Sequence, residues 1–310
     1  KPQPEAHKPP VFAAQPVNPT LNHAPINAHI SNKPSWSIAD RLISEASNVI
    51  IAEPPAITPI PAPTQSVIPT EAERLAVEAT PQQFQTASVV NGKSRSVGAG
   101  QQVRNPADHS DVVGSVSFAD AALAQEAVAA AVAAQSAWNG TPAAERAACL
   151  RRFADLLERH APALMMLAVR EAGKTLNNAI AEVREAVDFC RYYADEAEHT
   201  LPQGSQGVGT IVAISPWNFP LAIFTGEVVA ALAAGNTVVA KPAEQTSLIA
   251  GYAVSLMHEA GIPTSALQLV LGAGDVGAAL TQDPRIGGVI FTGSTEVARL
   301  INQTLAKRDD

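Results

Sequence analysis

From Gly209 onward, short and almost wholly apolar runs alternate with longer helical segments, and this alternation is the strongest constraint on the fold. We interpret "GTIVAIS", "NTVVAKP", "ALQLVLG" and "GGVIFTG" as buried strands. Helices are predicted over 221–235 and 246–260, and on both sides of the last strand. Apolar strands separated by helices of about 10–15 residues are typical of parallel βαβ units. We therefore predict an α/β fold whose residues 209–310 form a nucleotide-binding type of domain.

The preceding segment, residues 86–208, is predicted to be mainly helical after a few short β-like runs. An alanine-rich helix covers "AALAQEAVAAAVAAQSAW". A second helix is predicted to open at Thr141-Pro142, with the threonine as N-cap and the proline at the first helical position. A third covers about 162–172 and stops at Gly173, a glycine expected just beyond a helix end. A fourth starts near Thr175.

Residues 1 to about 85 differ in composition, because fifteen of the 24 prolines fall within the first 81 residues. Proline fixes φ and removes a hydrogen-bond donor, so this density opposes regular helix or sheet. We predict an extended Pro-rich linker, largely irregular, with one short helix around "SIADRLISEASNVI". A proline-rich docking peptide is the alternative.

Composition excludes several functional classes. Hydrophobic residues make up 46% and charged residues 16%, which is typical of a soluble globular protein. A net charge of −8 without a Lys/Arg cluster argues against a nucleic-acid binder. Cys149 and Cys190 are far apart and outside any C-x-x-C pattern, which excludes a disulfide scaffold and indicates no metal site.

The chain is expected to be cytoplasmic and to have no membrane span. The first residues lack the charged-then-apolar pattern of a secretory leader, so no secretory signal is expected. The most apolar window, Leu221–Ala240, is about long enough to cross a bilayer but contains Glu227, Gly235 and Asn236. A buried helix followed by a buried strand explains that window better.

Three glycines follow a predicted strand in "LVLGAGDVGAAL". Gly272, Gly274 and Gly277 satisfy G-x-G-x-x-G, the dinucleotide-binding pattern. That pattern also requires an acidic residue about 20 positions later, at the end of the next strand, and none is present there. A tight strand-to-helix turn is therefore favoured over a standard diphosphate site.

Two further strand ends have polar groups suited to a dinucleotide. Gly293 and Ser294 lie where a strand gives way to a helix, so backbone N–H groups and a hydroxyl can meet a diphosphate at the helix N-terminus. Ser294 as a simple N-cap is the alternative. Lys241 and Glu244 follow another strand at the ligand-binding edge of the sheet, where a carboxylate can accept both hydroxyls of a ribose. The alternative is a solvated surface pair.

Proline restrains both ends of the loop in "SPWNFP", at Pro216 and Pro220. Asn218 between them could donate its side-chain NH₂ to a developing oxyanion. Taken alone, Asn218 is as well explained as a turn residue.

In this order and spacing, "SPWNFP", "AAGNTVVAKPAEQT" and "FTGSTEVA" resemble the aldehyde dehydrogenase superfamily over about residues 86–310. "REAGKTLNNAIAEVREAVDFCRYYADEAE" is similar to the Δ1-pyrroline-5-carboxylate (L-glutamate γ-semialdehyde) dehydrogenase module of bifunctional proline utilization A (PutA) enzymes. The resemblance implies an aldehyde dehydrogenase-like fold: a Pro-rich linker (1–85), a helical N-terminal part (86–208) and an incomplete parallel-sheet NAD-binding domain (209–310). The implied reaction is NAD⁺-dependent oxidation of the semialdehyde to glutamate in proline catabolism.

The resemblance also implies roles for individual residues. Asn218 matches the oxyanion-hole asparagine. Glu185 and Phe189, on the same helix face as Glu182, match a carboxylate that faces the substrate amino group and an aromatic that packs on its aliphatic chain. An exposed helix glutamate is the alternative for Glu185. The implied NAD⁺-binding residues are Ser215, Pro216, Trp217, Lys241, Ala243, Glu244, Gly274, Gly277, Phe291, Gly293 and Ser294.

The sequence departs from the family pattern at its end. In the family a loop glutamate and a Gly-Gln-x-Cys nucleophile follow the "FTGST" helix, whereas this sequence ends at "LAKRDD". Attack on the aldehyde needs that thiolate, and Cys149 and Cys190 lie on apolar helix faces, as core thiols do. We therefore expect the N-terminal part of a larger enzyme, homo-oligomeric when complete, and no activity from this chain alone. FAD is expected only with an upstream proline dehydrogenase module. The alternatives are a general aldehyde dehydrogenase for another substrate and a truncated, non-catalytic NAD-binding protein.

Overall fold

The structure is a computed structural model that describes residues 70, 84–202 and 204–308. Nearly all of the predicted linker, and the short helix predicted within it, lie outside these residues. The helices and strands below all belong to the second of two units, residues 65–310.

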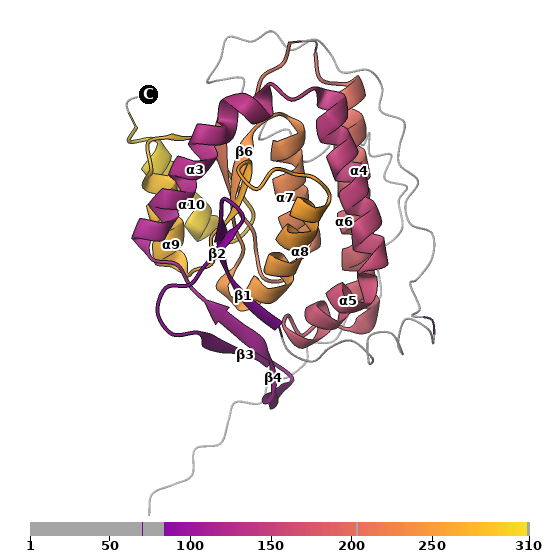
Figure 1. Cartoon of the computed structure of the whole chain (residues 1–310). Coiled ribbons are helices and arrows are strands. Elements are labelled where there is room, and N and C mark those ends of the chain that lie inside the picture. The colour runs from indigo at the N-terminus through magenta and orange to yellow at the C-terminus, as the bar shows by residue number, and fades with distance from the viewer. Residues whose placement is uncertain (1–69, 71–83, 203, 309–310) are drawn as a thin grey trace, which may run out of the picture. The chain divides into compact units, whose positions relative to one another are not determined.

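Eight strands form one sheet in the described residues (Figure 1). They are β1 (Phe84–Val90), β2 (Lys93–Arg95), β3 (Gln101–Asn105), β4 (Asp108–Ser117), β5 (Thr210–Ile214), β6 (Thr237–Lys241), β7 (Leu267–Leu269) and β8 (Ile286–Phe291). Their order is β3-β4-β1-β7-β6-β5-β8, and β2 pairs with β1. The pairs β7-β6, β6-β5 and β5-β8 are all parallel, which confirms the predicted parallel sheet. β1 extends it by pairing antiparallel with β7. The predicted boundary at residue 208 stays a prediction.

The helices follow the predicted order, with ends that differ by a few residues. They are α3 (Ala121–Asn139), α4 (Ala143–Arg159), α5 (Ala161–Arg170), α6 (Leu176–His199), α7 (Ala222–Ala233), α8 (Ser247–Glu259), α9 (Gly274–Gln282) and α10 (Thr295–Leu305). Gly173, after α5, has a φ of 67°, in the left-handed region that favours glycine. Thr175 caps α6 by accepting a hydrogen bond from the N–H of Asn178 at 3.3 Å.

The predicted cap of α4 is wrong. Pro142 occupies the N-cap position, and no side chain bonds to the first turn. The Thr141 hydroxyl instead donates to the carbonyl of Ala137 at 3.2 Å, in the last turn of the preceding helix. The connection between α3 and α4 is short. The Thr141 hydroxyl therefore bonds to the end of α3 and does not cap the start of α4.

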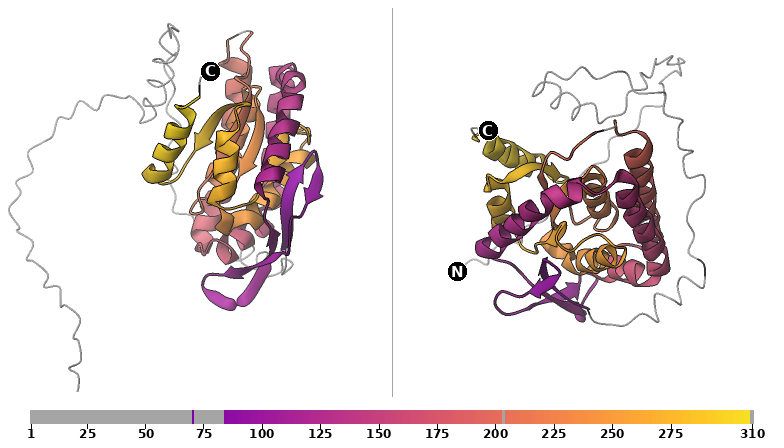
Figure 2. Two further views of the ribbon diagram at one scale, coloured as in Figure 1. Left: turned by 90° about the vertical axis from the view of Figure 1, so that its left-hand side faces the viewer. Right: turned by 45° about the horizontal axis from the view of Figure 1, so that its top comes forward.

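Successive residues of the central strands point to opposite faces of the sheet. Val212 and Val239 belong to the apolar cluster under α3 and α9. Ile211 and Val238, one position earlier, belong to the larger cluster shared with α7 and α8. α4, α5 and α6 pack outside α7 and α8 as a further layer, as Figure 1 and the right-hand view of Figure 2 show. Strands covered on both faces explain why the runs after Gly209 are apolar throughout.

A buried glutamate side chain caps the start of α8. Glu171 accepts hydrogen bonds from the backbone N–H groups of Leu248 at 2.7 Å and Ile249 at 2.9 Å. Burial raises the pKa of Glu171 to about 8, and these two hydrogen bonds oppose the rise. The first N–H groups of a helix have no partner within it, so the Glu171 oxygens satisfy two of them. Glu171 therefore joins the end of α5 to the start of a helix 77 residues further along the chain.

We predict that Glu171→Ala lowers the free energy of unfolding by about 2–4 kcal/mol, because it leaves two buried N–H donors without an acceptor. Glu171→Gln keeps one acceptor oxygen and should lose less. Urea unfolding followed by circular dichroism measures both values. Glu145→Ala, an exposed glutamate in the first turn of α4, is the matched control and should change stability by less than about 0.5 kcal/mol. Equal stability of Glu171→Ala and the control would contradict the role of this cap.

Candidate active site

The sheet has a topological switch point between β5 and β8. These strands are neighbours and parallel, but the chain leaves β5 for α7 on one face and leaves β8 for α10, which packs with α9 on the other. In open α/β sheets ligands bind in the crevice outside the carboxyl ends of such strands. The loop that contains Asn218 follows β5, and Gly293 and Ser294 follow β8. The N–H of Thr292 donates to the carbonyl of Ile214 at 3.1 Å, so the two loops start side by side.

The carboxyl end of β6 lies next to this crevice. The N–H of Ser215 donates to the carbonyl of Lys241 at 3.3 Å. Lys241 is only 4% exposed, so it is not a solvated surface residue. Its ammonium group donates to the carbonyl of Pro242 at 3.1 Å. Burial lowers the pKa of Lys241, and the nearby carboxylates of Glu244 and Asp275 oppose this shift. Lys241 and Glu244 are therefore placed together at the sheet edge.

The glycine-rich turn after β7 packs against the same lysine. A Cβ at Gly277 would lie 3.5 Å from Cε of Lys241, whereas the space around Gly274 is open. A Cβ at Gly272 would lie 2.4 Å from Cγ2 of Val276, so a larger residue does not fit there. This close approach supports the interpretation as a tight turn. It also places the predicted cofactor positions Gly274 and Gly277 near the Lys241 end of the site.

The turn after β8 is built on a glycine and a capping serine. A Cβ at Gly293 would lie 2.5 Å from Cζ of Phe291, so only glycine fits against that ring. Ser294 is the N-cap of α10, and its hydroxyl oxygen accepts from the N–H of Val297 at 3.2 Å. Ser294 therefore acts as an N-cap, the alternative considered from the sequence. Its role toward a diphosphate stays a prediction.

The loop after β5 exposes its central residues. Asn218 is exposed, and Trp217 and Phe219 on either side are 55% and 41% exposed. Within the described part of the chain, no hydrogen bond holds the Asn218 amide, which is therefore available to a ligand. The ammonium group of Lys174 lies 4.3 Å from the centre of the Phe219 ring, a cation–π contact that fixes one side of the loop. Pro216 is half-buried.

A buried carboxylate anchors the end of this loop to α6. Glu182 is 1% exposed and accepts from the N–H groups of Leu221 at 3.1 Å and Ala222 at 2.9 Å, at the start of α7. Its other oxygen lies 2.6 Å from the ammonium group of Lys174. The sequence interpretation noted Glu182 only as a face neighbour of Glu185 and did not use Lys174. Lys174 directly precedes Thr175, the N-cap of α6, and this position was the available sequence signal for an ion pair with Glu182 in that helix.

The predicted substrate residues lie on the face of α6 that meets α7. Glu185 is exposed, one turn after Glu182. Partial burial of its carboxyl raises its pKa, Glu182 adds to this shift and Lys174 opposes it. Phe189 packs on α7, where a Cβ at Gly226 would lie 3.1 Å from the phenyl ring. The Phe189 ring also stacks on Tyr193, with centroids 6.1 Å apart. The contacts of Glu185 and Phe189 with a substrate stay predictions.

Glu227 was not among the predicted site residues, but its environment is unusual. It is 8% exposed, and neither carboxyl oxygen makes a hydrogen bond within the described residues. Burial raises its pKa to about 8, and the side chain of Thr292, which lies nearby but outside hydrogen-bond geometry, offsets part of this rise. The hydroxyl groups of Ser215 and Thr225 are likewise buried without a partner there. A lone acid in an otherwise apolar helix was the available signal, since buried polar groups are normally paired.

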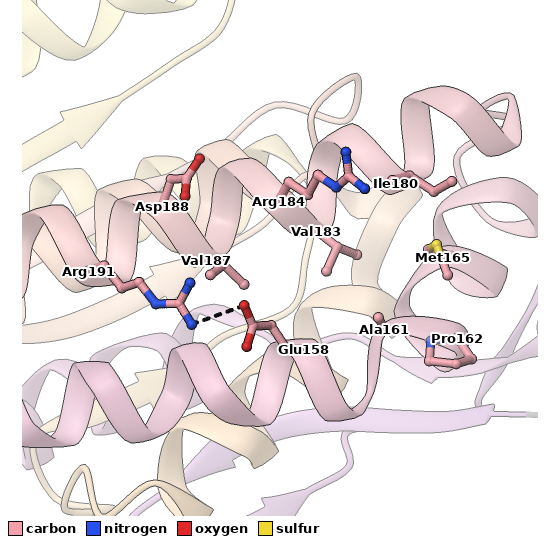
Figure 3. Close-up of a pocket in the computed structure, with 10 residues that line it drawn as sticks. All are labelled: Glu158, Ala161, Pro162, Met165, Ile180, Val183, Arg184, Val187, Asp188 and Arg191. Carbon is pink, nitrogen blue, oxygen red and sulfur yellow. Dashed lines mark hydrogen bonds and ion pairs between the residues drawn. The ribbon is translucent and has the colours of Figure 1, made fainter. Parts of the chain in front are cut away.

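A separate groove lies on the opposite face of α6 (Figure 3). Its volume of about 530 Å³ is within the range of ligand pockets. The Arg191 guanidinium donates a hydrogen bond to Glu158 across its rim at 2.9 Å, so these two polar groups are already paired with each other. None of the predicted site residues lines it. The lining residues are Glu158, Ala161, Pro162, Met165, Ile180, Val183, Arg184, Val187, Asp188 and Arg191.

Both cysteines are buried, as predicted. Burial raises the pKa of the Cys149 and Cys190 thiols, which makes them poor nucleophiles. In the described residues, no three His, Cys, Asp or Glu side chains are grouped as a metal site would require. Of the helices described, none is both long and apolar enough to cross a membrane.

Comparisons with known proteins agree with the motifs. The model of the aldehyde dehydrogenase family matches residues 93–309. Bifunctional protein PutA of Klebsiella aerogenes is 54% identical over 212 residues, which cover 68% of this chain and 16% of that protein. The 1-pyrroline-5-carboxylate dehydrogenase 2 of Bacillus subtilis (strain 168) is 39% identical over 233 residues, or 71% of this chain and 45% of that protein.

The fold comparison gives the same answer. A solved structure of a mutant of Thermus thermophilus 1-pyrroline-5-carboxylate dehydrogenase matches with a TM-score of 0.69 and 33% identity, and covers 82% of this chain and 52% of that chain. The chain thus spans about a sixth of the PutA protein and about half of the single-function dehydrogenases that it matches. These matches confirm the resemblance and the fold class.

The pKa of Glu227 predicts how stability depends on pH. The pKa of about 8 keeps the proton on this carboxyl in the folded protein up to about pH 8, whereas the unfolded chain loses it near the ordinary glutamate pKa of 4.5. Because the folded state then binds more protons, stability falls as pH rises between these values. Glutamine cannot ionise, so the Glu227→Gln variant should lack the part of the stability loss with rising pH that comes from Glu227. Its unfolding free energy should therefore rise relative to wild type between about pH 5 and 8, as measured by urea unfolding. Parallel pH profiles of the two proteins would disprove the burial of an uncharged Glu227.

Proposed function

The chain belongs to the aldehyde dehydrogenase family, and from this premise we propose that the full-length protein oxidises L-glutamate γ-semialdehyde to glutamate with NAD⁺. The PutA and 1-pyrroline-5-carboxylate dehydrogenase relatives support this substrate. Because the chain spans only part of their length, the proposal concerns the whole protein. Proline catabolism is the corresponding pathway.

One observation carries the proposal: three predicted elements follow neighbouring parallel strands and meet at one edge of the sheet. The Asn218 loop follows β5, the Gly293–Ser294 turn follows β8, and Lys241 with Glu244 follows β6. Parallel strands explain this convergence, since their carboxyl ends meet at the same sheet edge. Residues that are up to 76 positions apart in sequence, Asn218 and Ser294, thereby flank one site.

The residues present fit NAD⁺. The buried hydroxyl of Ser215 and the carboxyl of Glu227 lack partners within the described residues, and open space surrounds Gly274. In the proposal, Glu244 and Lys241 hold the adenosine ribose, and the start of α10 at Gly293–Ser294 holds the diphosphate. A carboxylate at the ribose disfavours a 2′-phosphate, so NAD⁺ is preferred over NADP⁺. When bound, NAD⁺ supplies the hydride acceptor.

The chain's own residues then orient and polarise the aldehyde. The free amide of Asn218 donates a hydrogen bond to the carbonyl oxygen as negative charge develops there, and Glu182 keeps that loop in place through α7. Glu185 faces the amino group of the substrate, and Phe189 packs on its aliphatic chain. The nucleophile that the reaction needs is assigned to neither cysteine of this chain, because both are buried core thiols.

Replacing Glu185 in the full-length enzyme tests the substrate assignment. Glu185→Ala removes a charge-assisted hydrogen bond of about 1.5–3 kcal/mol, so kcat/KM for L-glutamate γ-semialdehyde should fall by about 10–150-fold. Activity with propanal, which has no amino group, should change by less than about 2-fold. NADH absorbance measures both rates.

Two results would contradict parts of this account. An equal loss with both aldehydes would assign Glu185 a structural role and favour a general aldehyde dehydrogenase. No NAD⁺-dependent turnover of either aldehyde by the wild-type protein would overturn the proposed function itself. Asp188→Ala, which changes an exposed acid on another face of α6, is the matched control and should retain both activities.

A further inference from the structure

Glu227 is the most unusual buried group in the described structure, and the proposed reaction leaves it without a role. It lies in the second turn of α7, in the segment "AIFTGEVVAALA". Nearly all the remaining residues of this helix are apolar. Its side chain is nine-tenths buried, and both oxygens lack a hydrogen-bond partner in the described residues. An unpaired carboxyl costs stability. A group with this cost calls for a binding partner that is not part of the described chain.

The position of Glu227 points to the cofactor side of the crevice. Side chains of a helix tilt toward its N-terminus, and the N-terminus of α7 follows the Asn218 loop at the carboxyl edge of the sheet. The carboxyl accordingly lies beside Thr292. Thr292 directly precedes Gly293, where the diphosphate of the dinucleotide is proposed to bind. Glu227 therefore lies beside the residue that precedes the proposed diphosphate turn, on the helix that follows the Asn218 loop.

The chemistry of the carboxyl limits what it can bind. Burial raises the pKa of Glu227 to about 8, and no charged side chain contributes to this shift, so the protonated form predominates at neutral pH. An uncharged carboxyl has one O–H donor and one carbonyl acceptor. A primary carboxamide has the complementary pair, a carbonyl acceptor and an N–H donor, in the same planar spacing. A phosphate or carboxylate would use only the donor and leave the carbonyl of Glu227 unpaired.

We propose that Glu227 is a binding residue for the carboxamide of the nicotinamide ring, which it holds by two hydrogen bonds. The carboxyl O–H donates to the amide oxygen, and the carboxyl carbonyl accepts from the amide NH₂. This contact fixes the rotation of the ring and hence the face that it turns toward the aldehyde. The proposal rests on the proposed function, because it assumes that the dinucleotide binds at the switch point.

Ligand binding to the full-length protein separates this proposal from its premise. ADP-ribose has the adenosine, the diphosphate and the second ribose of NAD⁺ but lacks the nicotinamide ring. Isothermal titration calorimetry should give a Kd for NAD⁺ that rises about 10-fold or more in Glu227→Leu, with an unchanged Kd for ADP-ribose. Glu227→Gln keeps a donor and an acceptor and should bind NAD⁺ within about 3-fold of wild type.

A second test changes the ligand instead of the protein, so it does not depend on whether a variant folds. 3-Acetylpyridine adenine dinucleotide keeps the carbonyl oxygen but replaces the NH₂ with a methyl group, so wild type should bind it about 5–10-fold more weakly than NAD⁺. Equal affinity of wild type for the two dinucleotides would overturn the proposal, as would equal weakening of NAD⁺ and ADP-ribose by Glu227→Leu. Failure of wild type to bind even ADP-ribose would overturn the dinucleotide site, and with it the proposed function.

Discussion

The buried carboxylate of Glu182 connects the parts of the candidate site. It accepts hydrogen bonds from the N–H groups of Leu221, the N-cap of α7, and Ala222, its first residue. It also pairs with Lys174, whose ammonium group lies over Phe219. The buried, charged side chain of Glu182 thus holds the Asn218 loop against α6, and disrupting this contact would cost considerable folding free energy. Breaking a buried ion pair by removing one partner typically costs about 3–5 kcal/mol. Because Glu185 and Phe189 continue the same face of α6, this one contact sets the distance between Asn218, the predicted oxyanion donor, and the two predicted substrate residues.

The second constraint is the order of the strands. β5 and β8 lie side by side although their following helices cover opposite faces, so the two loops diverge at a topological switch point, where open α/β sheets bind ligands. The same apolar packing that buries β5 and β6 on both faces places their polar carboxyl ends at one edge. Lys241 is buried at that edge, where its charge acts in a medium that screens it less than water does. The position of the site follows from the topology, and its chemistry from a few residues at strand ends.

Much of the C-terminal fold was predictable because its signals are local. Continuous apolar runs, turn residues and helix lengths predicted the βαβ order, and the parallel pairing followed. The antiparallel addition of β1 to β7 was not predictable, because it joins strands about 180 residues apart through few contacts. The motif residues Asn218, Lys241, Glu244 and Ser294 were located correctly at strand ends. Glu182 and Lys174 contact the start of α7 and the Phe219 ring, about 40 residues further along the chain, so no spacing indicated these contacts. Glu227 has no hydrogen-bond partner within the described residues, so its burial could not be predicted from a contact.

The account depends on a dinucleotide bound across the switch point, and a crystal structure of the full-length protein with NAD⁺ tests this most directly. The adenosine ribose is predicted on Glu244 and Lys241, the diphosphate at Gly293–Ser294 and the carboxamide on Glu227. Electron density that places the diphosphate instead on the turn at Gly272–Gly277 would contradict the account. That result would show that the G-x-G-x-x-G segment, and not the crevice between β5 and β8, forms the cofactor site.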